Sequence, residues 1–172
     1  MSLNLFIRIA ALLGAMLILA AALSSALNVQ LARRFRRPFT DVHHPLAITG
    51  AVLIVIHPLL VAIQLKSARI LIPNFESFRS FWTMAGCPAL ILIALAIFSA
   101  LLMRRIRRFW RWGHWLIYPA LLMAGIHGLR MGQDLKNPFL AACLGILLAL
   151  ALAVFLFKRL KSRTASKAIK QN

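Results

Sequence analysis

The stretch RRFWRWGHWLIYPALLMAGIHG, residues 107–128, decides how this chain is organised. It begins with arginines, continues into an apolar run, and carries His114 and His127 thirteen positions apart. Ionisable side chains are costly inside a bilayer, and where they occur there they are functional by default. The two histidines are therefore the first candidates for a functional site.

A second stretch repeats this pattern. It is VHHPLAITGAVLIVIHPLL, residues 42–60, with His43, His44 and His57. Together with the two histidines above, these are all five histidines of the chain. Fourteen helical residues advance about 21 Å and rotate by about −40°, so His43 and His57 are predicted on one face near opposite membrane surfaces. His44 lies thirteen residues from His57, a rotation of about −140°. It is therefore the alternate candidate to His43.

The spacing in residues 107–128 is less favourable. His114 and His127 are thirteen residues apart, so a straight helix would not align them. Pro119 lies between them, and proline distorts a helix by removing one backbone hydrogen bond. We expect a local distortion at this point.

The composition indicates an integral membrane protein. Of 172 residues 62% are hydrophobic, the mean hydropathy is +0.83, and only three acids stand against 21 lysines and arginines. A soluble domain is about 45–50% apolar and about 25% charged. The net charge of +18 does not indicate a nucleic-acid partner, because the basic residues lie in short clusters between apolar spans, as membrane topology requires.

Five apolar spans predict an all-α integral membrane bundle of five transmembrane helices. Each span is close to the ~20 residues that cross a ~30 Å hydrocarbon core, and a helix satisfies its own backbone in lipid. The expected spans cover residues 5–27, 44–65, 84–103, 114–131 and 138–157. Residues 1–157 are expected to form one transmembrane haem-binding domain on the argument below, and residues 158–172 a basic, disordered cytoplasmic tail.

The distribution of basic residues predicts the orientation. Fifteen lysines and arginines follow the first, third and fifth spans, and six lie on the other side. The positive-inside rule then places the N-terminus outside and the C-terminus in the cytoplasm, in a multi-pass protein of the cell (inner) membrane. Residues 24–26, Ser-Ser-Ala, resemble a signal cleavage region. We favour an uncleaved anchor, because the apolar run is long and arginines follow it.

Two histidine pairs at matching depths on two helices are what two stacked, bis-histidine b-type haems require. His43 and His114 would hold the inner haem, and His57 and His127 the outer one. Both axial positions of each iron would be closed, which leaves electron transfer as the chemistry. A proton or metal path and plain packing are the alternative interpretations of these histidines.

Glycines and arginines near the histidines are secondary candidates. Gly50 and Gly125 lie between the paired histidines, where they would either admit a porphyrin or serve ordinary helix packing. Juxtamembrane arginines could meet the haem propionates. The candidates are Arg36, Arg37, Arg108 and Arg111 on the inner face, and Arg69, Arg79 and Arg130 on the outer face.

Over residues 30–157 the chain resembles the ferric reductase-like transmembrane domain of NADPH oxidases, ferric reductases and the haem subunit of the bacterial methionine-sulfoxide reductase system. VHHPLA is similar to that family's "LHRxLG" entry to its first haem helix, with His43 as the ligand. FWRWGHWLIY is similar to the "W-R-x-x-H-R-x-x-Y" entry to the second, with His114 as the ligand. The resemblance implies a membrane di-haem domain.

The chain departs from this family in three ways. Ala47 replaces the last glycine of "LHRxLG", one N-terminal helix of the usual six is missing, and no GxGxxG occurs. We therefore expect the reductant to come from a flavoprotein or other redox partner, from a loosely bound flavin, or from a quinol. The alternative functions are a quinol-linked di-haem cytochrome b subunit and a transporter or structural subunit without redox activity.

The remaining predictions concern residues expected on the outer side. Residues 72–82 carry aromatic side chains at helical spacing, which favours an amphipathic anchor in the membrane interface over a lid or docking surface. Glu76 and Asp134 are the acids expected outside, and we interpret both as solvated loop residues.

Overall fold

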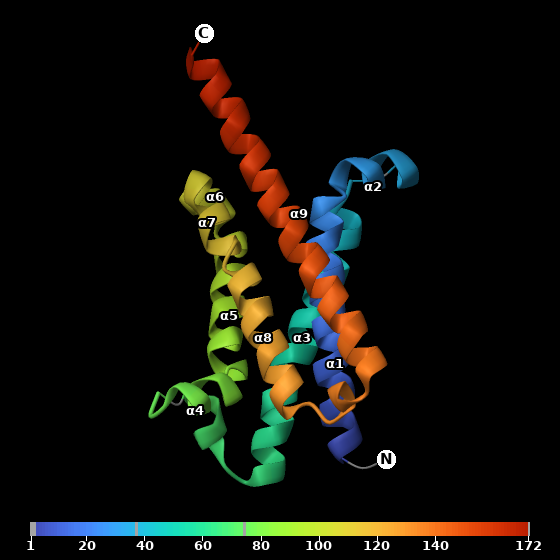
Figure 1. The fold of residues 1–172 in the computed structure, drawn as a ribbon, viewed down its shortest axis with the longest axis vertical. Helices are drawn as coiled ribbons and strands as arrows, with labels where there is room; N and C mark the ends of the chain where they lie inside the picture. Colours follow the sequence, from blue (N-terminus) through green and yellow to red (C-terminus); the bar gives the residue numbers. More distant parts are fainter. Residues whose placement is uncertain (1–2, 37, 74, 172) are drawn as a thin grey trace.

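Every regular element is helical in the part of the chain that the computed structural model describes, residues 3–36, 38–73 and 75–171 (Figure 1). Side chains are described up to residue 160, except those of residues 26 and 35. The elements are α1 (Leu3–Ala26), α2 (Asn28–Phe35), α3 (Thr40–Leu65), η1 (Ala68–Leu71), α4 (Phe78–Thr83), α5 (Gly86–Leu101), α6 (Met103–Ile106), η2 (Arg107–Phe109), α7 (Trp110–His114), α8 (Ile117–Met131), η3 (Asp134–Lys136) and α9 (Pro138–Gln171). The predicted all-α class is confirmed.

Within these described residues, three helices are long and apolar enough to cross a membrane. They are Leu3–Ser25 in α1, Thr40–Leu65 in α3 and Pro138–Leu160 in α9. They match the first, second and fifth expected spans within a few residues. Gly86–Leu101 and Met103–Met131 form a fourth candidate if they are taken as one broken span, bent by 70°. The structure thus has three or four candidate spans, and the number five stays a prediction.

The third and fourth expected spans correspond to α5 and α8, which lie side by side and run in opposite directions (Figure 1). The sixteen residues of α5 and the fifteen of α8 extend about 24 Å and about 22 Å, less than a ~30 Å hydrocarbon core. Short helices continue the chain beyond them, α4 before α5 and α7 before α8. Hydropathy alone does not reveal these breaks, because the residues on both sides of each break are apolar.

The chain is distorted just before Pro119, as expected. Residue 119 of a regular helix would donate to the Trp115 carbonyl, but proline has no N–H to donate. The Tyr118 N–H donates to Trp115 O instead, at 3.1 Å, and the Leu116 N–H donates to Gly113 O at 3.1 Å. Such tightened turns rotate by about 120° per residue rather than about 100°, which reduces the angular offset between the two histidines of this span.

Close packing of α1 against α3 forms one half of the bundle. A β-carbon at Gly50 would lie 3.0 Å from the backbone nitrogen of Ile18, and one at Gly14 would lie 3.0 Å from Cγ1 of Ile54. The two glycines therefore let the helix backbones approach each other. The core beside them contains Ile18, Leu19 and Ala22 of α1, together with Leu121 of α8 and Leu144 and Ala151 of α9.

Substituting Gly50 with valine is expected to destabilise the protein. The new side chain would press on the α1 backbone, and overpacking of this kind costs about 1–3 kcal/mol. Gly145→Val is the matched control, because a β-carbon at Gly145 has nothing within 4 Å. Thermal unfolding in detergent, followed by circular dichroism, measures the difference. Equal midpoints for the two variants would contradict the packing role of Gly50.

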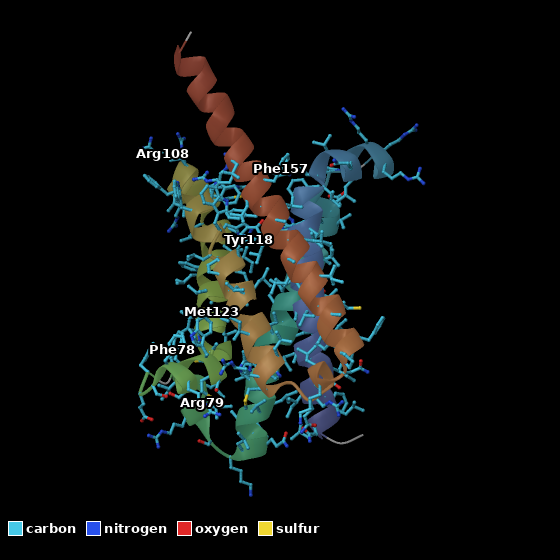
Figure 2. All side chains as sticks on the ribbon, viewed as in Figure 1. Phe78, Arg79, Arg108, Tyr118, Met123 and Phe157 are labelled. Atoms are coloured by element: carbon cyan, nitrogen blue, oxygen red, sulfur yellow. The ribbon has the colours of Figure 1, made fainter. Side chains whose placement is uncertain are left out.

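The second half of the bundle is joined to the first through α9. Tyr118 of α8 stacks on Phe155 of α9 with ring centres 4.0 Å apart, and Arg159 lies over the Trp115 ring at 4.0 Å (Figure 2 labels Tyr118). Cation–π contacts of this kind hold helices together at their polar ends. Trp115 is thus half-buried, in contact with Arg159 and Phe155 of α9.

The backbone of α9 remains helical through Gln171, so the expectation of a disordered tail after residue 157 was wrong. The tail is rich in lysine, arginine and alanine, all strong helix formers, and it continues a helix that is already nucleated.

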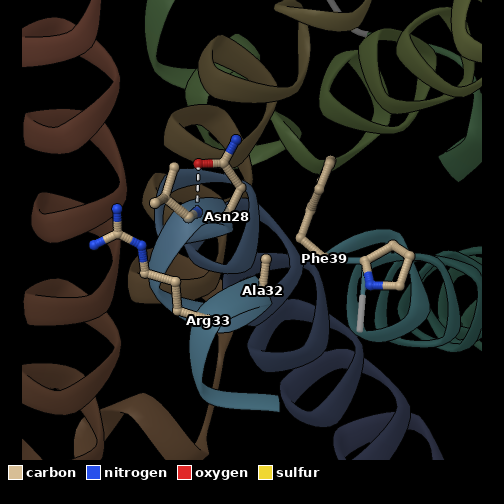
Figure 3. A pocket seen from close by; sticks show the side chains of 6 residues that line it. Asn28, Ala32, Arg33 and Phe39 are labelled. Carbon is tan, nitrogen blue, oxygen red and sulfur yellow. Dashed lines mark hydrogen bonds between the residues drawn. The ribbon is translucent and has the colours of Figure 1, made fainter. Parts of the chain in front are cut away.

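The basic clusters gather at one end of the bundle. Figure 1 shows α2, α6, α7 and the C-terminal part of α9 at this end, with the N-terminus and α4 at the other. In Figure 2, Arg108 lies at the first end and Arg79 at the second. At the first end, α2 and the two residues that precede α3 border a shallow apolar groove (Figure 3). Its lining residues are Asn28, Val29, Ala32, Arg33, Pro38 and Phe39.

Candidate functional site

The histidines of α3 are held by backbone carbonyls of α1. His43 Nδ1 lies 2.9 Å from the carbonyl oxygen of Ala21, and His57 Nδ1 lies 3.1 Å from that of Ile7. Ile7 and Ala21 are fourteen residues apart, the same spacing as the two histidines. Because α1 and α3 are antiparallel, one helix presents acceptors in register with the imidazoles of the other.

The histidines of α7 and α8 are held in the same way by the other half of the bundle. His114 Nδ1 lies 3.2 Å from the Ala96 carbonyl oxygen in α5, and His127 Nδ1 lies 2.7 Å from that of Thr83. Thr83 is the last residue of α4, where helix carbonyls have no intrahelical partner. Thirteen residues separate the two carbonyls, as they separate the two histidines.

The short helix α4 is fixed at its start as well. Ser77 and Ser80 form a capping box, in which the Ser80 N–H donates to Ser77 Oγ at 3.0 Å. Phe75 and Phe78 leave 73% and 80% of their area exposed, which agrees with an aromatic anchor in the membrane interface. The segment therefore exposes aromatic side chains at its start and supplies the Thr83 carbonyl to His127 at its end.

The carbonyl contacts define the chemical state of the four imidazoles. A carbonyl oxygen only accepts hydrogen bonds, so each Nδ1 must carry the proton. In the neutral ring, Nε2 then keeps a lone pair and is available as a ligand. Second bonds of this type orient histidine ligands in metal sites and raise their basicity.

His43 and His114 face each other across the two halves of the bundle. Their ring centres are 6.3 Å apart and their planes are inclined by 71°. A metal bound about 2 Å from each nitrogen, with about 1.1 Å from nitrogen to ring centre, separates two axial imidazoles by about 6.2 Å. The observed ring-centre distance is close to this value.

His57 and His127 lie near each other, at the opposite end from the arginine clusters, where they contact the carbonyls of Ile7 and Thr83. His44 is exposed and lies beside His43, with ring centres 5.8 Å apart. The structure thus brings the rings of His43 and His114 into contact, places His57 near His127, and leaves His44 outside both pairs.

The two glycines between the histidines do not face the space between the pairs. Gly50 packs on α1, and a β-carbon at Gly125 would lie 2.9 Å from Leu148 Cδ2 of α9. The interpretation that they admit a porphyrin is therefore wrong, and ordinary helix packing explains both.

Two other glycines, which sequence reasoning missed, make room beside the site. A β-carbon at Gly86 would lie 2.9 Å from both Cδ2 and Nε2 of His127. Gly113 directly precedes His114, and a β-carbon at Gly113 would lie 2.6 Å from Cβ of Ser99. Neither glycine lies between paired histidines in the sequence, so only the tertiary contacts identify them.

The candidate arginines lie at the surface, where solvent or lipid headgroups reach them. At the end of the bundle where the basic clusters gather, Arg108 lies over Phe109 and Arg111 over Trp110, at 5.0 Å and 5.8 Å from the ring centres. Arg37 lies outside the described residues. The other six candidate arginines are all exposed: Arg36, Arg69, Arg79, Arg108, Arg111 and Arg130.

Asp134 is not a freely solvated loop residue, contrary to the prediction. It forms a two-bonded ion pair with Arg8 of α1, in which Arg8 Nε donates to Asp134 Oδ2 at 2.9 Å and Nη2 donates to Oδ1. The hydrogen bond from Arg8 holds the pKa of the Asp134 carboxyl below its ordinary value. Ile7, which holds His57, is the neighbour of Arg8, so the pair fixes α1 beside the second histidine pair.

Replacing Asp134 with asparagine is expected to lower the unfolding midpoint by no more than about 3 °C at pH 7, because the pair is partly exposed. A carboxyl with a depressed pKa stabilises the folded state above its unfolded pKa of about 3.9. This contribution is lost as the pH falls through the lower folded-state value. The difference between wild type and variant should therefore vanish at acidic pH. A difference that grew on acidification would contradict the pair.

The arrangement of ligating groups is one of pairs rather than clusters. Within the described residues, no group of three or more His, Cys, Asp or Glu side chains is placed to hold a metal ion. A bare metal ion needs about four protein ligands in a structural site. A macrocycle that supplies four equatorial nitrogens needs only the two axial ligands that each pair offers.

An all-helical chain with several candidate membrane spans and four carbonyl-backed histidines, two of them in ring contact, defines a class of membrane proteins built around histidine-bearing helices. Over residues 7–125, more than half of its length, the chain matches the family described as ferric reductase like transmembrane component. It therefore belongs to this ferric reductase-like transmembrane family, which confirms the resemblance. No curated protein and no solved structure matches the chain.

The match begins at Ile7 and so includes α1, which the resemblance over residues 30–157 left out. His43, His57 and His114 lie within the matched range, and His127 follows its end by two residues.

Proposed function

We propose that this protein is a di-haem b-type membrane cytochrome. It transfers electrons across the cell (inner) membrane, between a donor in the cytoplasm or the membrane and an acceptor on the outer face. His43 and His114 hold the inner haem, and His57 and His127 hold the outer one. The observation that carries the proposal is the pairing itself, with each Nδ1 backed by a carbonyl and the inner ring centres 6.3 Å apart.

When bound, such haems exchange electrons without binding a substrate at the iron, because both axial positions are closed. The contribution of the chain is to hold the ligands. Two carbonyls of α1 orient the histidines of α3, and carbonyls of α4 and α5 orient those of α7 and α8. Because His43 and His57 lie fourteen residues apart on one helix, α3 would set the separation of the two haems.

The proposed topology has five spans, with the N-terminus outside and the C-terminus in the cytoplasm. It is supported by the gathering of α2, α6, α7 and the end of α9 at one end of the bundle, since these elements carry most of the arginines and lysines (Figure 1). His43 and His114 then lie toward the cytoplasm.

The partners in this proposal are membrane lipid and a flavoprotein or other redox protein. A flavin or a quinone from such a partner would supply electrons, because the sequence carries no nicotinamide-binding GxGxxG motif. A nucleic-acid partner is not part of the proposal.

A reduced-minus-oxidised absorption spectrum of the purified protein tests the proposal, together with the ratio of haem to protein. We expect a b-type spectrum and two haems per chain. Well-folded protein without a b-type signal would contradict the proposal and favour a transporter or structural subunit. Haem reduction by an added quinol in liposomes, without a partner protein, would identify the quinol-linked alternative.

A further inference from the structure

Buried polar side chains are rare in this protein, and their position is informative. Among the residues whose side chains are described, the buried polar ones are Ser24 and Ser99, with 6% and 8% of their area exposed. They come from different halves of the bundle, α1 and α5, yet both lie at the level of the first histidine pair.

Ser24 shares a carbonyl with the first histidine of this pair. Its Oγ–H donates to Ala21 O at 2.7 Å, and the same oxygen accepts from His43 Nδ1 at 2.9 Å. Ser24 Oγ also lies 3.4 Å from His43 Nδ1, beyond the usual range of about 2.7–3.2 Å for a strong bond. Donation to the shared carbonyl is therefore the stronger of its two contacts.

Ser99 does the same for the other histidine. Its Oγ–H donates to Ala96 O at 2.8 Å, and that oxygen accepts from His114 Nδ1 at 3.2 Å. Gly113 admits this serine, because a β-carbon there would lie 2.8 Å from Ser99 Oγ. Both carbonyls of the first pair are thus shared with a buried hydroxyl.

The second pair differs. Its acceptors are the carbonyls of Ile7 and Thr83, and in the described part of the chain neither receives a hydroxyl. Serine hydroxyls in helices often donate to a carbonyl in the preceding turn, so such a bond alone does not indicate a functional role. What marks Ser24 and Ser99 is burial together with a shared histidine acceptor.

We propose that Ser24 and Ser99 are positioning residues that raise the reduction potential of the inner haem, an inference that rests on the proposed function. A carbonyl that already accepts from a hydroxyl is a weaker acceptor for the Nδ1–H of histidine. A weaker bond at Nδ1 makes the imidazole a less basic ligand, which stabilises ferric iron less. Removing either hydroxyl therefore shifts the inner haem toward the oxidised state.

The test is a redox titration of purified, haem-loaded Ser24→Ala and Ser99→Ala. Ser25→Ala is the matched control, because Ser25 Oγ donates to Ala22 O at 2.7 Å, an oxygen that holds no histidine. His57→Ala identifies the inner component by removing the outer haem. Outer-shell changes at metal sites alter affinity about 10- to 100-fold, and this more remote change should lower the reduced-to-oxidised ratio of the inner haem about two- to five-fold at a fixed ambient potential.

The expected result is a lower inner midpoint in both serine variants and an unchanged outer midpoint. An unmoved inner midpoint, or an equal shift in Ser25→Ala, would overturn the inference. Alanine is the best helix former, and the carbonyls keep their other partners, so the variants retain the fold. Absence of a b-type spectrum in the wild type would instead overturn the proposed function.

Discussion

Replacing His57 with alanine is expected to leave one haem per chain where the wild type is proposed to bind two. The outer haem would lose one of its two axial ligands, and His127 alone would not retain it. His127→Ala should remove the same haem, and the double variant should lose no more than either single one, because the two residues act as one unit. Haem-to-protein ratios and the number of components in a redox titration measure this result.

The inner pair supplies the complementary result. His43→Ala or His114→Ala should remove the other haem and leave the outer spectral component in place. His44→Ala is the control, since this exposed histidine lies outside both pairs and should retain two haems. If His44→Ala lost a haem and His43→Ala did not, the assignment of the inner ligand would be reversed.

Gly86→Val is expected to remove or strongly disturb the outer haem while the helices remain folded. A β-carbon at this position would lie 2.9 Å from Cδ2 and Nε2 of His127, closer than side-chain atoms approach. The imidazole would have to rotate, which would break its 2.7 Å bond to the Thr83 carbonyl and turn Nε2 away from the proposed haem. Losing a hydrogen bond that orients a ligating histidine costs about 10- to 100-fold in metal affinity.

Gly145→Val provides the matched control for this change, because it introduces the same side chain in a helix without a neighbour within 4 Å. It should bind two haems with wild-type midpoints. Circular dichroism shows whether Gly86→Val keeps its helices. A folded Gly86→Val protein with two haems and an unshifted outer midpoint would show that the His127 ring is not confined as described.

The helical spans illustrate how much of the fold local sequence can predict. Long apolar runs with no internal break predicted α1, α3 and the membrane part of α9 within a few residues, because in lipid such runs have no other way to satisfy their backbones. The shorter α5 and α8 were predicted only approximately. Their ends depend on local turns such as the one before Pro119, where the loss of one donor rearranges several hydrogen bonds.

Some features of the candidate site could likewise be predicted from local sequence, and others could not. The spacing of His43 and His57 was enough to predict that they share a face, because helical geometry alone fixes it. The roles of Gly50, Gly86 and Asp134 could not be predicted. Each depends on a residue 32 to 126 positions away, and no local pattern encodes such a contact.

The sequence by itself determined that this protein is an all-helical membrane chain with its histidines at two depths, since hydropathy and helical periodicity are local properties. Only the tertiary structure decided which carbonyl holds each imidazole. The antiparallel register of α1 against α3, and of α4 and α5 against α7 and α8, places four acceptors at the spacing of four donors. That register arises from packing between distant segments, and it fixes the proton on Nδ1 and leaves Nε2 free to bind.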